Sequence, residues 1–202
     1  MFGLPATTAI NKPLYKKTVF EKFNLKTAER DRFDADISRM ALVARVSPAT
    51  VPALSEGQDI KGFYVLQVIL KQKEYNVQNI LLLHKLIPQQ IVFALQFEEQ
   101  TQLCIFHTRL QQSEWKQTET IDIPLKGLSL DDVWDNIVAT IGDLDIEAEE
   151  SIEEQIINRE QHEKLLRQIE ALEKRCRVEK QTRKRYELHQ QIVKLKKELE
   201  YD

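Results

Sequence analysis

Residues 61–110 decide the fold, and they read KGFYVLQVIL KQKEYNVQNI LLLHKLIPQQ IVFALQFEEQ TQLCIFHTRL. Four dense apolar runs stand in this stretch, at 63–70, 80–83, 91–95 and 103–106. The first run is apolar on both faces in part, which predicts a strand in the middle of a sheet. The second predicts a helix over 77–87, with Asn76 as its cap and Pro88 at its end.

The last two runs predict a hairpin of strands over 90–97 and 102–110. Because the connection 98–101 contains no glycine, we expect a turn of more than two residues. A more polar segment, 115–123, predicts a weak strand at the edge of the sheet, where charged side chains discourage further pairing.

The chain before this stretch carries weaker signals. We expect 1–11 to be a loose arm. A helix is predicted over 27–38, with Asp36 on its polar, solvated side. A strand over 40–46 follows, and 49–62 connects it to the central strand.

The clearest helix start lies after the sheet. Ser129 and Asp132 have the spacing of a capping box, and Leu128 and Val133 stand at the two positions of a hydrophobic staple. Apolar residues then recur at helical spacing up to Gly142. This pattern predicts a helix that packs on the sheet and ends at the glycine.

The composition changes after this helix. The residues 143–150 are mostly acidic, and 151–200 contains neither proline nor glycine. We therefore expect two parts. The first, 1–142, is an α+β domain with a mixed sheet of about five strands, and the second, 143–202, is an acidic linker followed by a helical, coiled-coil-like extension.

The extension carries two apolar seams for a partner helix. Their residues are Leu165, Ile169, Leu172 and Cys176, and then Leu188, Ile192, Leu195 and Leu199. Each set has the 4-3-4 spacing of a coiled-coil core, but the sets are out of register with each other. The chain either turns near 180–184 into an antiparallel hairpin, or continues as one long helix that pairs with another chain. The hairpin is favoured, although no glycine or proline supplies its loop.

Seven basic residues lie around the end of the first seam and before the second. They are Lys174, Arg175, Arg177, Lys180, Arg183, Lys184 and Arg185, with Glu179 as the one acid among them. One interpretation is a solvated hairpin tip or helix face. Another is a set of phosphate contacts that bind DNA or RNA without sequence preference. The acidic run 143–154, in the same chain or a second one, is a third possible partner.

Composition narrows the class of protein. The chain has 202 residues and five glycines. Its formal net charge is −3, so the chain is not basic throughout. We expect no membrane span, because no apolar run approaches the roughly 18 residues needed, and no secretory signal at the N-terminus. Cys104 and Cys176 fall in elements of different type, so we expect no disulfide and a cytoplasmic location.

Motifs for catalysis do not stand out, and we expect no catalytic residue, metal site or cofactor. The glycines cannot form a phosphate loop, and the four histidines have no ligand spacing. A restriction-type metal nuclease places an Asp, and then an acid two residues before a lysine, on adjacent strands, because the two carboxylates hold Mg²⁺. Asp59 precedes the central strand, but Ile69 stands two residues before Lys71, and Lys71 two before Lys73.

Several segments together resemble a known family. They are Phe23-Asn24-Leu25, 33–37, Val46-Ser47-Pro48, Leu70-Lys71, Ile87-Pro88, 91–95 and Trp115-Lys116. The chain is similar over nearly its whole length to an uncharacterised bacterial family, catalogued only as a domain of unknown function. Members are typically encoded beside SNF2-like helicases, DNA methyltransferases and type III-like restriction subunits. The resemblance implies a role in a restriction–modification or antiphage island, and it assigns no catalytic residue.

Three functions follow as expectations. The first is a non-catalytic adaptor subunit of a bacterial DNA-processing system. Its C-terminal helices would dock on a helicase, methyltransferase or restriction subunit, or on a second copy. The second is a nucleic-acid-binding module that uses the basic residues of 174–185. The third is a metal-dependent nuclease.

Overall fold

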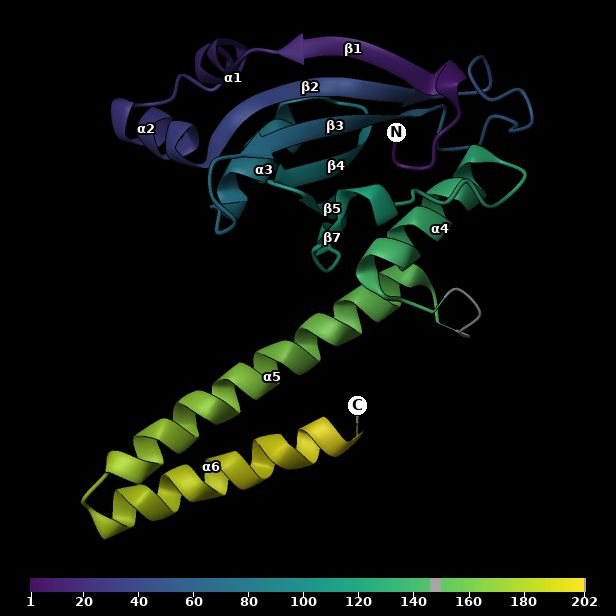
Figure 1. The fold of residues 1–202 in the computed structure, drawn as a ribbon. Helices are drawn as coiled ribbons and strands as arrows, with labels where there is room; N and C mark the ends of the chain where they lie inside the picture. Colours follow the sequence, from purple (N-terminus) through teal and green to yellow (C-terminus); the bar gives the residue numbers. More distant parts are fainter. Residues whose placement is uncertain (146–149, 202) are drawn as a thin grey trace. The chain divides into compact units, whose positions relative to one another are not determined.

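The structure of the protein is a computed structural model, which describes residues 1–145 and 150–201 (Figure 1). Contacts between residues divide the chain into two compact units, Met1–Ala148 and Glu149–Asp202. The first unit holds a β-sheet, and the second holds two long helices. Part of the expected acidic linker, 146–149, lies outside the described residues.

The first unit is built on a mixed sheet with the order β1-β2-β3-β4-β5-β6, and β7 pairs with β5. The strands are β1 Ala9–Leu14, β2 Ile37–Val46, β3 Phe63–Leu70, β4 Gln90–Phe97, β5 Gln100–His107, β6 Arg109–Gln112 and β7 Lys116–Gln117. The central strands β3 and β4 are parallel, and the other neighbouring pairs are antiparallel. The predicted α+β class and mixed sheet are confirmed, with seven strands in place of about five.

Helices are distributed along the whole chain. They are α1 Lys16–Lys22, α2 Thr27–Asp36, α3 Val77–Leu86, α4 Leu130–Gly142, α5 Ile152–Val178 and α6 Thr182–Tyr201. Short 3-10 turns cover Ala6–Thr8 and Thr118–Thr120. The helix α3 makes the crossover between the parallel strands β3 and β4, as such a connection requires.

Apolar side chains are buried on both faces of the sheet. On one face, Phe33 of α2 and Ile80 of α3 join Phe93 of β4 in a single buried cluster. On the other face, Trp134 of α4 packs against Phe63 of β3, with 5.6 Å between the ring centroids. Side chains alternate between the two faces of a strand, so burial on both faces explains the dense apolar runs of the central strands.

The N-terminal residues are part of the fold, so the expectation of a loose arm over 1–11 is wrong. The strand β1 pairs with β2 through its backbone, and α1 follows it. Phe2 and Leu4 are buried, and the backbone N–H of Ile123 donates to the carbonyl of Phe2 at 3.1 Å. Because most side chains of β1 are exposed, the strand leaves no apolar alternation in the sequence.

The hairpin after β4 also differs from expectation. Phe97 pairs with Gln100, so the turn has two residues, Glu98 and Glu99, and is not longer. Glu98 adopts the left-handed conformation, with φ of 52°, although it is not glycine. The predicted strand 102–110 is broken at Thr108, where φ is 55° and the chain reverses into β6.

The predicted edge strand 115–123 is reduced to the two residues of β7. Hydroxyl groups take over the backbone bonds that a longer strand would make. The Ser113 hydroxyl accepts from the backbone N–H of Leu103 at 3.0 Å, and the Thr118 hydroxyl donates to the carbonyl of Glu99 at 2.9 Å.

The start of α4 confirms the predicted capping box. The hydroxyl of Ser129 accepts from the backbone N–H of Asp132 at 3.2 Å, and the Asp132 carboxylate accepts from the backbone N–H of Ser129 at 3.0 Å. The staple is not formed, because Leu128 is 82% exposed. The helix ends at Gly142 as expected, but the left-handed residue that caps it is Asp143, with φ of 53°.

Candidate functional site

The two C-terminal helices form an antiparallel hairpin, which we define as α5, α6 and the turn between them. The helix α5 starts at a full capping box. The Ser151 hydroxyl accepts from the backbone N–H of Glu154 at 3.2 Å, and the Glu154 carboxylate accepts from the backbone N–H of Ser151 at 2.9 Å. The Glu154 carboxylate accepts from the backbone N–H of Ser151 and also from its hydroxyl, and these two bonds lower the pKa of Glu154, because they stabilise its charged form.

The turn of the hairpin contains no glycine. It consists of Glu179, Lys180 and Gln181, and the Glu179 carboxylate accepts a hydrogen bond from the backbone N–H of Gln181 at 2.8 Å. The backbone N–H of Glu179 donates to the carbonyl of Arg175, which closes the last turn of α5. The hydrogen bond to the Glu179 side chain therefore stabilises a loop that contains no glycine or proline.

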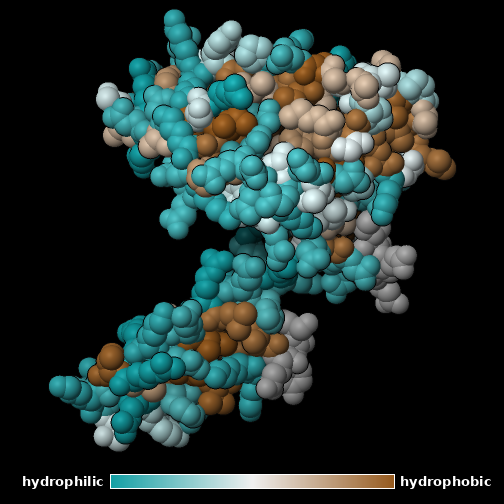
Figure 2. All heavy atoms as spheres, viewed as in Figure 1, coloured by the Kyte–Doolittle hydropathy of each residue, from teal (hydrophilic) through white to brown (hydrophobic). Residues whose placement is uncertain are grey.

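The eight seam residues lie between the two helices. Ile169 and Ile192 are 6% and 7% exposed. The other six are part-buried, and they are Leu165, Leu172, Cys176, Leu188, Leu195 and Leu199. The thiol of Cys176 donates to the carbonyl of Arg185 across the turn, at 3.7 Å. Figure 2 shows apolar side chains in a strip along these helices, with polar side chains around it.

An ion pair marks one side of the hairpin. Lys196 of α6 lies 2.8 Å from the carboxylate of Glu173 of α5. The hydrogen bond from Lys196 lowers the pKa of Glu173. Exposed pairs of this kind contribute little stability, so the apolar seam holds the helices together and the ion pair helps to align them.

The seven basic residues of 174–185 come together at the turn, and all seven are exposed. We call this group the basic tip. Lys174 pairs with Glu170 at 2.7 Å, and Arg183 pairs with Glu187 at 3.2 Å. Within the described parts of the chain, Lys180, Lys184 and Arg185 make no ion pair. The tip therefore presents a dense positive charge to whatever approaches it.

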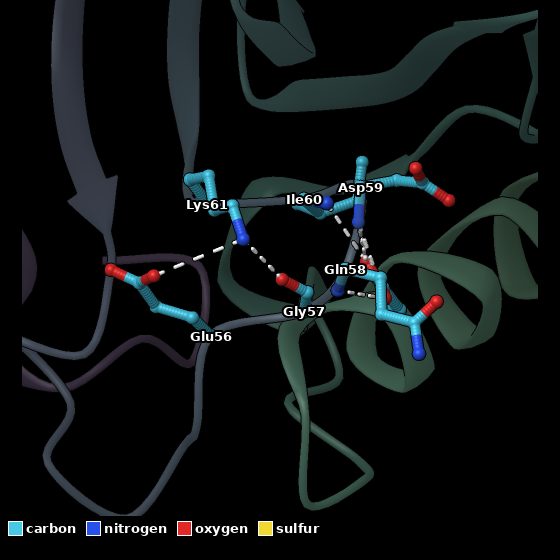
Figure 3. Close-up of polar contacts among 7 residues, drawn as sticks. Glu56, Gly57, Gln58, Asp59, Ile60 and Lys61 are labelled. Carbon is cyan, nitrogen blue, oxygen red and sulfur yellow. Dashed lines mark hydrogen bonds and ion pairs between the residues drawn. The ribbon is translucent and has the colours of Figure 1, made fainter.

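A second polar cluster joins the 56–61 loop to α4 (Figure 3). The Asp131 carboxylate accepts from the backbone N–H groups of Ile60, Asp59 and Gln58. These bonds, that of Ile60 foremost, lower the pKa of Asp131. A Cβ at Gly57 would collide with this carboxylate. The loop thus has the form of an anion-binding site, but the chain's own aspartate occupies it, so it serves to attach the loop to the helix.

Asp36 is buried, which corrects the expectation that it is solvated. It is the last residue of α2 and 6% exposed. Its carboxylate accepts from the side chain of Asn79 at 2.7 Å, the backbone N–H of Asn76 at 2.8 Å and the side chain of Gln72 at 3.0 Å. The carboxylate therefore connects the end of α2 to the start of α3.

The nuclease residues do not assemble. Ile69 belongs to β3 and cannot bind a metal, and the backbone N–H of Asp59 is directed at Asp131. Among the residues that the structure describes, no three His, Cys, Asp or Glu side chains lie close enough to hold a metal ion. His84 stacks on Phe106 with 4.3 Å between ring centroids, and burial lowers its pKa.

Both cysteines are free thiols. Cys104 is fully buried, and burial raises its pKa to about 12. Its sulfur lies 3.7 Å from the hydroxyl of Tyr75, which donates to the Gln102 side chain at 2.8 Å. A thiol with so high a pKa is a poor nucleophile, so this cluster belongs to the core of the sheet.

Two open hollows lie on the first unit. One, of about 240 Å³, is lined by residues that include Glu29, Arg32 and Asn76. The other, of about 320 Å³, is lined by residues that include Lys116 and Lys126. Neither contains a buried polar side chain without a hydrogen-bond partner in the part of the chain that the structure describes.

Comparisons place the chain in a family but give it no characterised relative. Across the described residues, no helix combines the length and apolar character needed to cross a membrane. No curated protein and no solved structure shows a significant match to the chain. A family model described as "Domain of unknown function (DUF4391)" matches residues 2–199, and the chain therefore belongs to that family.

Proposed function

We propose that the protein is a cytoplasmic, non-catalytic adaptor subunit of a bacterial DNA-processing system of the restriction–modification or antiphage kind. Its hairpin docks on a partner protein such as a helicase, methyltransferase or restriction subunit. The family resemblance, with helicase and methyltransferase genes beside its members, supports the choice of system. The hairpin supports the docking role.

The observation that carries the docking role is the incomplete burial of the seams. Two helices can cover each other along one line only, and six of the eight seam residues remain part-exposed. Leu166 and Val193 add 44% and 38% exposed apolar side chains beside the seam. Apolar stripes of this length are normally covered by a third or fourth helix, as in a helical bundle.

The test is affinity capture of the tagged protein from its own host, with nuclease treatment in parallel and mass spectrometry as the readout. We expect a helicase, methyltransferase or restriction subunit to be recovered after nuclease treatment. The double variant Leu166→Asp with Val193→Asp should lose it. Leu128→Asp is the matched control, because it makes the same change at an exposed leucine of the first unit. Capture that is equal in all three proteins would refute docking through the hairpin.

A second candidate function is nucleic-acid binding by the basic tip, favoured by its seven exposed cations. Replacing Arg183, Lys184 and Arg185 with glutamine should weaken DNA binding and reduce its salt slope by about one unit for each phosphate that the protein no longer binds. Fluorescence anisotropy with a labelled duplex measures both quantities. Glutamine at the exposed Lys12, Lys17 and Lys22 removes the same charge elsewhere. If the two triple variants weaken DNA binding equally, the binding is a general attraction between charges and the basic tip is not a specific site.

A further inference from the structure

One side of the hairpin carries an open apolar surface. Leu166 and Glu173 are seven residues apart, so they lie on the same side of α5. Val193 and Lys196 are three apart, so they share a side of α6. Because Glu173 and Lys196 form an ion pair at 2.8 Å, these two sides are one side of the hairpin. Leu166 and Val193 therefore lie on this same side of the hairpin, beside the part-buried seam.

Charge is unevenly distributed along the hairpin. We call residues 150–163 the acidic start, since they contain five glutamates and one arginine. The basic tip lies at the other end, with seven cations and Glu179 among them. The two groups stand far apart on the same long helix, so they cannot neutralise each other within one hairpin.

The spacing of these groups has a simple symmetry. Leu166 follows Glu153 by thirteen residues and precedes Lys180 by fourteen. A helix rises 1.5 Å per residue, so the apolar centre lies about 20 Å from each charged end. If a second hairpin lay antiparallel across Leu166, each tip would reach the acidic start of the other.

We infer that the hairpin pairs with the hairpin of a second copy of this chain, antiparallel and about a two-fold axis. The side of Leu166 and Val193 lies at the interface, and each basic tip lies against the acidic start of the other copy. The inference rests on the proposed docking role of the hairpin and names its partner. The same patch meets itself across the axis, as in most homodimers.

Charge complementarity favours a second copy over nucleic acid as the occupant. Nucleic acid would use the tip alone, and the glutamates on the same helix would repel the phosphates that continue past it. A second copy uses both ends and also covers the apolar middle. Pairing two hairpins gives four helices around one core, which is the commonest way to bury such seams.

Sedimentation velocity of the full chain over a wide concentration range is the first experiment. The chain has a mass of 23.7 kDa, and we expect a species of twice that mass to increase with concentration. Leu166→Asp with Val193→Asp should weaken the dimer about a hundredfold or more, because it buries two carboxylates from each copy in an apolar interface. Leu128→Asp should leave the dimer unchanged. A wild-type chain that stays monomeric at every concentration would overturn the inference.

Exchange of charges tests the antiparallel orientation. One variant carries Arg177→Glu, Lys180→Glu, Lys184→Glu and Arg185→Glu, which change the net charge of the tip from +6 to −2. The other carries Glu150→Lys, Glu153→Lys and Glu160→Lys, which change the net charge of the acidic start from −4 to +2. Each alone places like charges opposite each other and should be monomeric. When the two are mixed, both contacts regain opposite charges, so a mixed dimer should form. If the mixture stays monomeric while the wild type dimerises, the antiparallel arrangement is wrong.

These outcomes separate the inference from the proposed function. Suppose that the chain is monomeric, but that it captures a helicase or methyltransferase which the hairpin variant does not capture. Pairing with a second copy is then ruled out, and the adaptor function stands. If the chain forms a dimer that depends on the hairpin but captures no other protein, pairing with a second copy stands and the adaptor function is ruled out. Circular dichroism of each variant shows whether the helices are still formed.

Discussion

Replacing Asp36 with alanine should destabilise the first unit strongly, although sequence patterning places this residue on a polar helix face. Its carboxylate is buried and accepts three hydrogen bonds at the junction of α2 and α3. The hydrogen bond from the side chain of Asn79 is buried, and that from the backbone N–H of Asn76 is part-buried. Alanine would leave both without an acceptor.

The expected loss follows from those two donors. An unsatisfied buried donor costs about 1–3 kcal/mol, so the buried donor of Asn79 and the part-buried donor of Asn76 together give a loss of about 3 kcal/mol in the free energy of unfolding. The donor from Gln72 is closer to solvent and adds little. Asn79 and Asn76 both donate to Oδ2 of Asp36, whereas Gln72 donates to Oδ1. Asp36→Asn keeps an acceptor oxygen in the place of Oδ2 and directs its amide N–H₂ toward Gln72, so it should lose clearly less stability than Asp36→Ala.

Urea unfolding followed by tryptophan fluorescence measures this loss. Both tryptophans of the chain, Trp115 and Trp134, lie in the first unit, so the signal does not report on the hairpin. With a slope of about 2 kcal/mol per molar urea, the midpoint should fall by about 1.5 M. Asp31→Ala, at an exposed acid of the same helix, is the control and should shift it little. Equal midpoints for Asp36→Ala and Asp31→Ala would refute the buried network.

Four further predictions concern other contacts. Gly57→Ala should lower the urea midpoint, because its methyl group collides with the Asp131 carboxylate. The pKa of Asp131 is lowered in the folded state, so its contribution to the free energy of unfolding is present above pH 3.8, its ordinary pKa, and is lost as the pH falls below that value. Asp131→Asn should therefore make the free energy of unfolding less dependent on pH in acid. Ile192→Ala should cost the hairpin about 2–4 kcal/mol, measured by helical circular dichroism. Cys104 should resist a thiol reagent until the chain unfolds, while part-exposed Cys176 reacts with it.

Local signals in the sequence predict the middle of the fold well. The strands β3 and β4 follow from apolar runs that are buried on both faces. The helices α3 and α4 follow from caps at Asn76 and Ser129, each of which satisfies a backbone N–H of the first turn. These features depend on residues only a few positions apart, and so they can be seen in the sequence.

The features that sequence patterns do not predict depend on partners that are distant in sequence. The donors to Asp36 come from residues 36 to 43 positions away, and the loop held by Asp131 lies 71 to 73 positions before it. The strand β1 pairs through its backbone and needs no apolar pattern. The turn at Glu98 uses a left-handed glutamate, for which residue type supplies no signal.

For the hairpin, the seams and the basic segment could be found by spacing and composition, but their relation could not. The turn depends on Glu179 accepting from the backbone N–H of Gln181, which no general rule for loops predicts. The side of the hairpin on which Leu166 and Val193 lie is identified by the pairing of Glu173 with Lys196, 23 residues apart. Only with both in place do Leu166 and Val193 fall on one surface.

The two roles considered for the basic tip compete for the same side chains. Cations that contact the acidic start of a second copy cannot contact phosphate at the same time. DNA that used the tip would therefore pull the hairpins apart, whereas DNA that bound elsewhere would leave the dimer intact. Salt does not separate these cases, because it weakens every contact between exposed charges. The apolar contact at Leu166 and Val193 does separate them, since it supports pairing with a second copy and contributes nothing to phosphate binding.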